Sequence, residues 1–192
     1  MTRHPAHPIH TQFTARWSPR AFADTPVTEA QMLTMLEAAR WSPSSNNGQP
    51  WRFVWALRGE AAFDAIAAAL VPFNRDWAPR AGALVVLASK ATRIDSKGAE
   101  VPNGPHAFDS GAAWMSLALQ AHLMGLVAHA MGGFDAEALA QAVALPAGHT
   151  IHATIAIGPQ GDPATLPEAL QARETPNGRE PLDTIAHRGR FA

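Results

Sequence analysis

Apolar residues along much of the chain recur at the spacings of amphipathic helices. Residues 28–40 are predicted to form a helix, because Thr28 and Gln31 make a capping-box pattern ahead of the periodic apolar positions. A second helix is predicted over residues 60–70. A third is predicted over residues 135–143, capped by the aspartate that begins it.

Short apolar runs bounded by turn residues predict strands at residues 52–57, 83–88, 126–131 and 151–157. The run at 83–88 contains no polar residue, which is typical of a strand buried on both faces. Because these strands alternate with helices, periodicity by itself favours a parallel α/β sheet.

The most apolar helix is predicted over residues 108–124 and ends at Gly125. Its apolar side chains lie nearly all round the helix rather than on one stripe. Such a helix is expected to be buried on most sides, either at the centre of a domain or at a subunit interface.

The two ends of the chain lack this periodicity. Residues 1–12 hold two prolines and three histidines, and we expect a flexible, solvated tail there rather than a metal site, because no carboxylate accompanies the histidines. Residues 158–181 hold five prolines and three glycines. This stretch is either disordered or lies along another surface, and anchors at Leu182, Ile185 and Phe191 favour the second alternative.

The composition of the chain argues against several classes of function. A length of 192 residues suits one domain, and 15 basic against 16 acidic residues argue against a nucleic-acid partner. The chain has no cysteine, which excludes disulfides, thiol nucleophiles and thiolate metal sites and suits the cytoplasm. The longest apolar stretch, at 112–121, is too short to span a membrane, and the N-terminus has no signal-peptide core.

Three segments are candidates for chemistry. Residues 16–20 place two arginines and a hydroxyl together, which suits phosphate, although a solvated basic turn explains this segment alone better. Residues 42–51 crowd hydroxyl, amide and backbone N–H groups beside a tryptophan, which favours a heteroaromatic ligand over a plain turn. Gly132 and Gly133 would permit close approach to a planar ligand or make a tight turn.

Several other chemistries lack support. The sequence holds no Gly-x-Gly-x-x-Gly, Walker or Gly-x-Ser-x-Gly pattern. His149 and His152 have no acidic partner at ligand spacing, so no metal site is expected. The carboxylates are scattered, so paired-carboxylate hydrolysis is not supported either.

Four blocks in order resemble the nitroreductase family of FMN flavoproteins, over residues 13–191. They are Arg16-x-Ser18-x-Arg20-x-Phe22, Glu37-Ala38-Ala39-Arg40-x-x-Pro43-Ser44-Ser45-x-Asn47-x-Gln49-Pro50-Trp51-x-Phe53, Asp109-x-Gly111-Ala112-Ala113 with Gly125-Leu126, and Arg179-x-Pro181-Leu182 before His187 and Phe191. The resemblance implies an α+β fold with a central, mainly antiparallel sheet wrapped by helices. It also implies a single FMN-binding domain over residues 13–192. Its extension, 158–192, would cross to the partner of a homodimer that holds FMN at the subunit interface.

The resemblance also implies roles for individual residues. Arg16 and Arg179 would hold the FMN phosphate, and Arg20 would approach the N1–C2=O edge of the flavin. No side chain would be catalytic, because flavin N5 does the chemistry while Arg20 and the backbone of Gly133 tune it. The full set implied to contact the cofactor is Arg16, Trp17, Ser18, Arg20, Pro43, Ser44, Ser45, Asn47, Gln49, Asn74, Met131, Gly132, Gly133 and Arg179. Pro43, Ser44 and Ser45 would come from the partner chain.

The sequence departs from the family pattern at three positions. Gly132 stands where relatives often have Glu, which would leave more room over N5. Asn177 replaces a Lys of some relatives, and Trp77 replaces a basic residue, which would leave Arg20 as the lone cation near N1.

The implied activity is that of an oxidoreductase working by ping-pong hydride transfer. NAD(P)H would reduce the flavin, and a nitroaromatic, quinone or similar electron-poor acceptor would then be reduced in the same place. One alternative is a specialised flavin enzyme of the dehalogenase or enal reductase type, although the short, polar stretch 91–105 favours an open, promiscuous site. Another alternative is a non-enzymatic flavin-binding protein.

Overall fold

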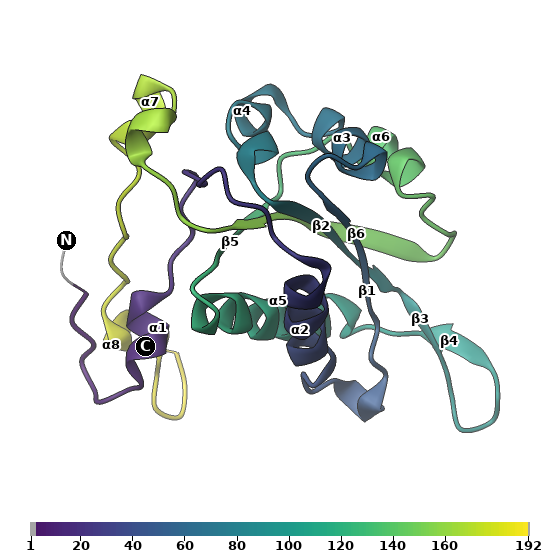
Figure 1. The fold of residues 1–192 in the computed structure, drawn as a ribbon. Coiled ribbons are helices and arrows are strands. Elements are labelled where there is room, and N and C mark those ends of the chain that lie inside the picture. The colour runs from purple at the N-terminus through teal and green to yellow at the C-terminus, as the bar shows by residue number, and fades with distance from the viewer. Residues whose placement is uncertain (1–2, 192) are drawn as a thin grey trace.

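The computed structural model describes residues 3–191, and its centre is a four-stranded sheet (Figure 1). The strands lie in the order β1 (Trp51–Leu57), β2 (Ala83–Lys90), β6 (His149–Gly158) and β5 (Val127–Met131), and every neighbouring pair is antiparallel. The mainly antiparallel sheet implied by the family resemblance is therefore confirmed. The parallel sheet that periodicity alone favoured is wrong.

Helices cover both faces of this sheet. Figure 1 shows α2 (Glu29–Arg40) and α5 (His106–Leu123) on one face, and α3 (Ala61–Ala68), α4 (Pro72–Arg75) and α6 (Ala136–Ala142) on the other. The protein is thus an α+β structure of three layers, with one apolar cluster on each side of the sheet.

Strand β2 shows why its sequence is apolar without alternation. Leu84 and Val86 belong to the cluster that also holds α3 and α6, whereas Val85 and Leu87 belong to the cluster that holds α2 and α5. All four side chains are almost fully buried. Successive strand residues point to opposite faces, so a sheet covered on both sides needs apolar residues at every position.

The predicted helix starts are confirmed by their caps. The Thr28 side chain accepts a hydrogen bond from the Gln31 backbone N–H, and the Gln31 side chain accepts one from the Thr28 N–H. Asp135 likewise accepts hydrogen bonds from the N–H groups of Glu137 and Ala138. Each cap satisfies backbone donors that have no partner inside the helix.

Helix α5 buries only one of its faces within a single chain. Ala113 and Leu117 are fully buried against the sheet, while Phe108 is 82% and Leu123 is 64% exposed. The alternative that this helix lies at the centre of a domain is therefore wrong, and a subunit interface stays a prediction.

The remaining elements are short and were not predicted from periodicity. Strands β3 (Thr92–Ile94) and β4 (Glu100–Pro102) form a separate two-stranded hairpin that extends beyond the main sheet (Figure 1). The other short segments are helices α1 (Thr11–Ala15), α7 (Glu168–Gln171) and α8 (Leu182–Ile185), and the 3₁₀ turns η1 (Ser45–Asn47), η2 (Ala78–Arg80) and η3 (Pro163–Thr165).

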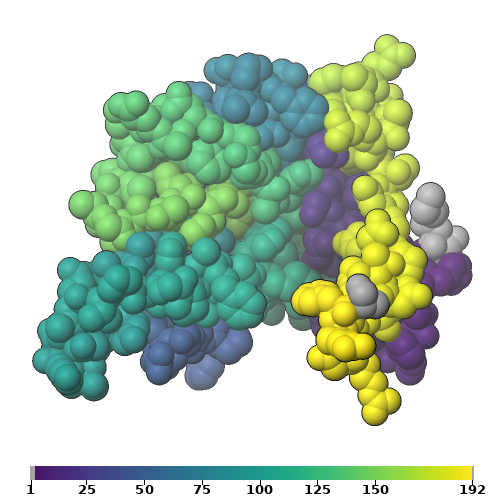
Figure 2. All heavy atoms as spheres, turned by 180° about the vertical axis from the view of Figure 1, so that it is seen from behind, coloured from purple at the N-terminus to yellow at the C-terminus, as the bar shows by residue number. Residues whose placement is uncertain are grey.

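Segments from the two ends of the chain lie side by side. Phe22 forms a β-bridge with Gln160, and the N–H of Gly161 donates to the carbonyl of Ala21 at 2.9 Å. A Cβ atom at Gly161 would clash with the backbone carbonyl of Phe22, so only glycine fits this contact. Figure 2 shows the yellow C-terminal segment against the purple N-terminal residues.

None of the helices described in residues 3–191 has both the length and the apolar character that crossing a bilayer requires.

Candidate functional site

An open cleft of about 610 Å³ lies where the two ends of the chain meet. Its lining comes from the N-terminal segment, from strand β5 and from the C-terminal extension. The lining residues are Arg3, Arg16, Trp17, Ser18, Arg20, His129, Arg173, Thr175, Pro176, Asn177, Gly178 and Arg179. Five of these side chains are arginines, and among the described residues that line the cleft there is no carboxylate.

Arg16 and Arg179 come together in this cleft from positions far apart in the sequence. Arg16 follows directly after α1, and its Nη1 donates to the hydroxyl of Ser18 at 3.3 Å. The pKa of Arg16 is lowered by burial and, to a lesser degree, by the charges of Arg179 and Arg3. Repulsion between guanidinium groups, with no carboxylate in the cleft lining, makes the cleft a strong attractor for an anion.

Arg3 is a member of this group that sequence reasoning missed. Its Nε donates to the carbonyl of Asn177 at 2.9 Å, and its Nη1 donates to the carbonyls of Thr14 and Arg16 at 3.0 and 2.8 Å. One side chain thereby ties the N-terminal residues to the C-terminal extension beside Arg16. No motif marks Arg3, because all of its partners are backbone carbonyls.

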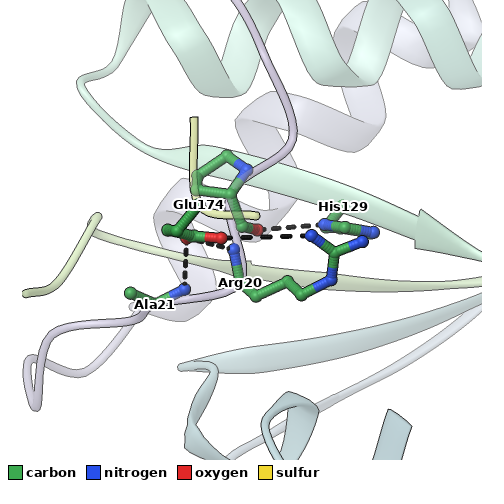
Figure 3. A network of polar contacts seen from close by, with 5 residues as sticks. Arg20, Ala21, His129 and Glu174 are labelled. Atoms are coloured by element: carbon green, nitrogen blue, oxygen red, sulfur yellow. Dashed lines mark hydrogen bonds and ion pairs between the residues drawn. The ribbon is translucent and has the colours of Figure 1, made fainter. Parts of the chain in front are cut away.

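A buried carboxylate positions the backbone at Arg20 (Figure 3). Oε1 of Glu174 accepts hydrogen bonds from the N–H groups of Arg20 and Ala21, at 2.6 and 2.8 Å. Oε2 of the same residue lies 4.0 Å from Nη1 of Arg20. Glu174 was also missed at the sequence level, since nothing local indicates that its partners lie at the other end of the chain.

The Nε atom of Arg20 is buried and has no hydrogen-bond partner within the described residues. The guanidinium carbon lies 5.8 Å from the centre of the Trp77 ring, at a cation–π distance. Burial is the main cause that lowers the pKa of Arg20, Arg173 adds to it, and Glu174 opposes it. An unpaired donor on a buried cation is costly unless a ligand accepts from it.

His129 lines the same cleft from strand β5. Its ring lies 4.7 Å from the Trp77 ring, and its Nδ1 is 3.0 Å from the carbonyl of Pro19 (Figure 3). Since that carbonyl can only accept, the ring donates from Nδ1. Burial, with smaller contributions from Arg20 and Arg16, lowers the pKa of His129 to about 4, against the Pro19 contact that raises it. The imidazole is therefore neutral at pH 7.

A second group of predicted residues meets where β5 ends. Met131 is the last residue of the strand and is buried. Asn74 is buried as well, and its amide Nδ2 donates to the carbonyl of Gly133 at 2.9 Å. A Cβ at Gly133 would lie 2.8 Å from that nitrogen and 2.9 Å from Val71, whereas a Cβ at Gly132 would meet nothing within 4 Å. Gly133 is therefore closely packed against Asn74 and Val71, whereas Gly132 faces open space.

The serine- and asparagine-rich loop, residues 43–49, lies apart from the cleft that the five arginines line (the arginine cleft). None of its predicted contact residues is in the cleft lining; these are Pro43, Ser44, Ser45, Asn47 and Gln49. Asp109 holds the loop by accepting a hydrogen bond from the Ser45 N–H at 3.1 Å. Asn46, Asn47 and Gln49 have left-handed backbone φ angles of 52°, 53° and 43°. Such strain in residues other than glycine is concentrated at functional sites in proteins.

Within residues 3–191, no group of three or more histidine, cysteine, aspartate or glutamate side chains is placed to hold a metal ion.

Comparison with known proteins identifies one solved structure and two curated proteins that are similar to this chain. A solved structure described as an oxidoreductase containing FMN is 40% identical and covers 99% of this chain and 96% of its own, with a TM-score of 0.96. A Streptomyces griseus protein provisionally named an NADH dehydrogenase/NAD(P)H nitroreductase is 27% identical over 77% of this chain and 83% of its own length. An uncharacterized 15.4 kDa protein of Mycolicibacterium smegmatis is 42% identical over 86 residues, 44% of this chain and 58% of that protein.

A family model also matches most of the chain. The model described as the nitroreductase family matches residues 13–159, which include the first arginine block, the serine- and asparagine-rich loop and all four strands of the main sheet. This match spans well over half of the chain, and the fold agrees with it. The chain belongs to the nitroreductase family.

Proposed function

We propose that this protein is an FMN-dependent oxidoreductase that uses NAD(P)H to reduce electron-poor acceptors such as nitroaromatics and quinones. The arginine cleft carries this proposal, because it gathers guanidinium groups around a space without a carboxylate. The 40% identical relative described as an oxidoreductase containing FMN supports it. Bound FMN would supply hydride transfer through its N5 atom.

The residues present in the cleft fit the phosphate of FMN. Arg16 and Arg179 would bind the dianion, Ser18 would donate to a phosphate or ribityl oxygen, and Trp17 would pack beside it. Planar guanidinium groups suit phosphate oxygens, and a dianion would offset both the burial and the smaller repulsion from Arg179 and Arg3 that lower the pKa of Arg16. Asn177, where some relatives have Lys, contributes its backbone carbonyl to Arg3 instead of a further charge.

The unpartnered Nε of Arg20 fits the pyrimidine edge of the flavin. A cation placed there would stabilise negative charge at N1–C2=O and so favour flavin reduction. Asn74 would present its amide to the same ring. Met131 and the backbone of Gly133 would lie beside N5, and the open space at Gly132 would admit the acceptor.

The loop at residues 43–49 would serve the flavin of a second subunit. In this proposal the protein is a homodimer, and Pro43, Ser44, Ser45, Asn47 and Gln49 reach across to the partner's cofactor. Exposed apolar residues of α5, such as Phe108, would lie in the interface. Residues 13–192 would form one FMN-binding domain behind residues 1–12. The extension 158–192 contacts its own chain through Gln160, Gly161 and Glu174, and its end would cross to the partner, where the exposed Leu182, Ile185 and Phe191 would anchor it.

Two alternatives make different predictions. A specialised flavin enzyme would act on a narrow acceptor class and would be expected to carry a large lid over its site. The stretch 91–105 forms only a short hairpin, which favours an open site instead. A flavin-binding protein without activity would load FMN but would not oxidise NAD(P)H steadily when menadione or a nitroaromatic is present.

The decisive experiment is a visible spectrum of the purified protein, followed by stopped-flow reduction with NADH and NADPH and then a panel of acceptors. We expect a yellow protein that either nucleotide bleaches and that an acceptor reoxidises. Sedimentation analysis would show the dimer. A colourless protein that cannot be reconstituted with FMN would refute the proposal.

A further inference from the structure

A second pocket, of about 310 Å³, lies between the serine- and asparagine-rich loop and the β3–β4 hairpin. It shares no residue with the arginine cleft. Its lining consists of Asn46, Asn47, Gly48, Pro50, Arg52, Lys90, Thr92, Arg93 and Ile94. Three of these nine residues are basic and none is acidic, so the pocket is a second candidate site for an anion.

Two of the cations lie on one face of the sheet. Arg52 of β1 stands opposite Ala88 of β2, and Lys90 follows two residues later, so Arg52 and Lys90 are diagonal neighbours on the same face. Lys90 is neutralised by Glu100 of the hairpin, with its Nζ 3.0 Å from Oε1. Arg52 and the half-buried Arg93 make no ion pair within the described residues. Two positive charges in the pocket are therefore uncompensated.

The guanidinium of Arg52 is held in place by the backbone around the loop. Its Nη1 donates to the carbonyls of Gln49 and Trp51, at 3.0 and 2.7 Å. The carbonyl of Gln49 belongs to the strained loop, in which Asn46 and Asn47 also have left-handed φ angles. A fixed guanidinium loses little entropy when it binds a second partner, and its planar donors match phosphate oxygens.

We propose that this pocket binds the 2′-phosphate of NADPH and selects NADPH over NADH. The inference rests on the proposed function, because it requires the loop at 43–49 to lie beside the flavin where the nucleotide reacts. The two nucleotides differ only in this phosphate, a monoester that carries close to two negative charges at pH 7. Arg52 and Arg93 supply the two matching charges, and arginine is a common partner of this group.

Equilibrium binding of 2′,5′-ADP and 5′-ADP to the FMN-loaded protein tests the pocket directly. These ligands carry the same number of phosphates, and FMN keeps them out of the arginine cleft. We expect 2′,5′-ADP to bind about tenfold or more tightly, the effect of one charge-assisted contact, and Arg93→Ala to abolish the difference. Lys97→Ala changes a hairpin residue outside the pocket lining and should preserve the difference.

Steady-state kinetics provide the second readout. In Arg93→Ala the KM for NADPH should rise about tenfold, while kcat and the KM for NADH stay within about twofold. Arg93→Lys should recover part of the loss. Equal binding of the two ADP isomers, or equal losses with both nucleotides in Arg93→Ala, would overturn the pocket assignment.

The two proposals fail in different ways. A yellow, active protein that does not distinguish the ADP isomers refutes the pocket alone. A protein that binds 2′,5′-ADP through Arg93 but oxidises neither nucleotide supports the pocket and refutes the proposed function.

Discussion

The carboxylate of Glu174 accepts a hydrogen bond of 2.6 Å from the backbone N–H of Arg20. This contact joins the C-terminal extension to the segment that carries the first arginine block. The same oxygen also accepts from the N–H of Ala21, so one buried side chain satisfies two backbone donors. The backbone at Arg20 is consequently positioned by Glu174, which belongs neither to the block that begins at Arg16 nor to the block that begins at Arg179.

Replacement of Glu174 by glutamine should therefore destabilise the fold. The glutamine amide would keep one acceptor oxygen but remove the charge beside Arg20, and we expect a loss of about 1–3 kcal/mol in the free energy of unfolding. Denaturant titration measures this loss. Glu168→Gln, at an exposed site in α7, is the matched control and should stay within about 0.5 kcal/mol. Equal stability of the two variants would contradict the role of Glu174.

Replacement of Arg16 by alanine should weaken FMN binding by roughly tenfold to a hundredfold, because a charge-assisted contact with the phosphate is lost. Fluorescence titration of the apoprotein with FMN measures the dissociation constant. Arg58→Ala removes an arginine outside the cleft that pairs with the exposed Asp24, and it should leave the affinity unchanged. Full retention of cofactor by Arg16→Ala would remove Arg16 from the phosphate site.

The two neighbouring glycines at the end of β5 should respond differently to an added methyl group. In Gly133→Ala the new methyl group would push the side chains of Asn74 and Val71 away from residue 133, which should cost about 1–3 kcal/mol of stability. Gly132→Ala meets open space and should cost less than about 1 kcal/mol. Chemical denaturation of both variants checks the difference, and equal costs would contradict the packing at Gly133.

Acid should destabilise the protein through His129. Burial lowers the pKa of His129 from 6.5 to about 4, so the unfolded chain binds a proton more readily than the folded one between these pH values. Stability should thus be complete above pH 6.5 and should fall by roughly 3 kcal/mol as the pH drops through 4. Urea unfolding at pH 7, 5 and 4 measures the slope.

The variant His129→Gln separates this effect from that of other groups. The pKa of His152 is also lowered, by burial and by His106, so it contributes a fall in the same direction. His129→Gln should therefore show a shallower fall than the wild type rather than none. An identical slope in both proteins would exclude His129 as a source.

Sequence patterns predicted those parts of the fold that depend on local physics. The caps at Thr28 and Asp135 are local, because each side chain binds a backbone N–H within three residues. Strand direction is not local, and β2 is buried on both faces in the antiparallel sheet just as it would be in a parallel one. The resemblance to a family, rather than periodicity, was needed to predict the antiparallel arrangement.

The parts that were not predicted are held by polar contacts. In the β3–β4 hairpin, Oδ1 of Asp95 accepts from the N–H groups of Lys97 and Ala99, so a side chain rather than an apolar pattern shapes the turn. At the cleft, Arg3 and Glu174 bind backbone groups from distant segments. Such partners have no sequence signature, which explains why the arginine motifs were recognised and their supports were not.

The order of the strands has a consequence for folding. The central pair, β2 and β6, brings Lys90 beside His149, although the hairpin, α5, β5 and α6 lie between them in the chain. Closing so long a loop costs entropy before any contact is gained, so this step is slow compared with helix formation. The arginine cleft needs β5 and the chain beyond β6, and we infer that cofactor capture follows the closing of the sheet.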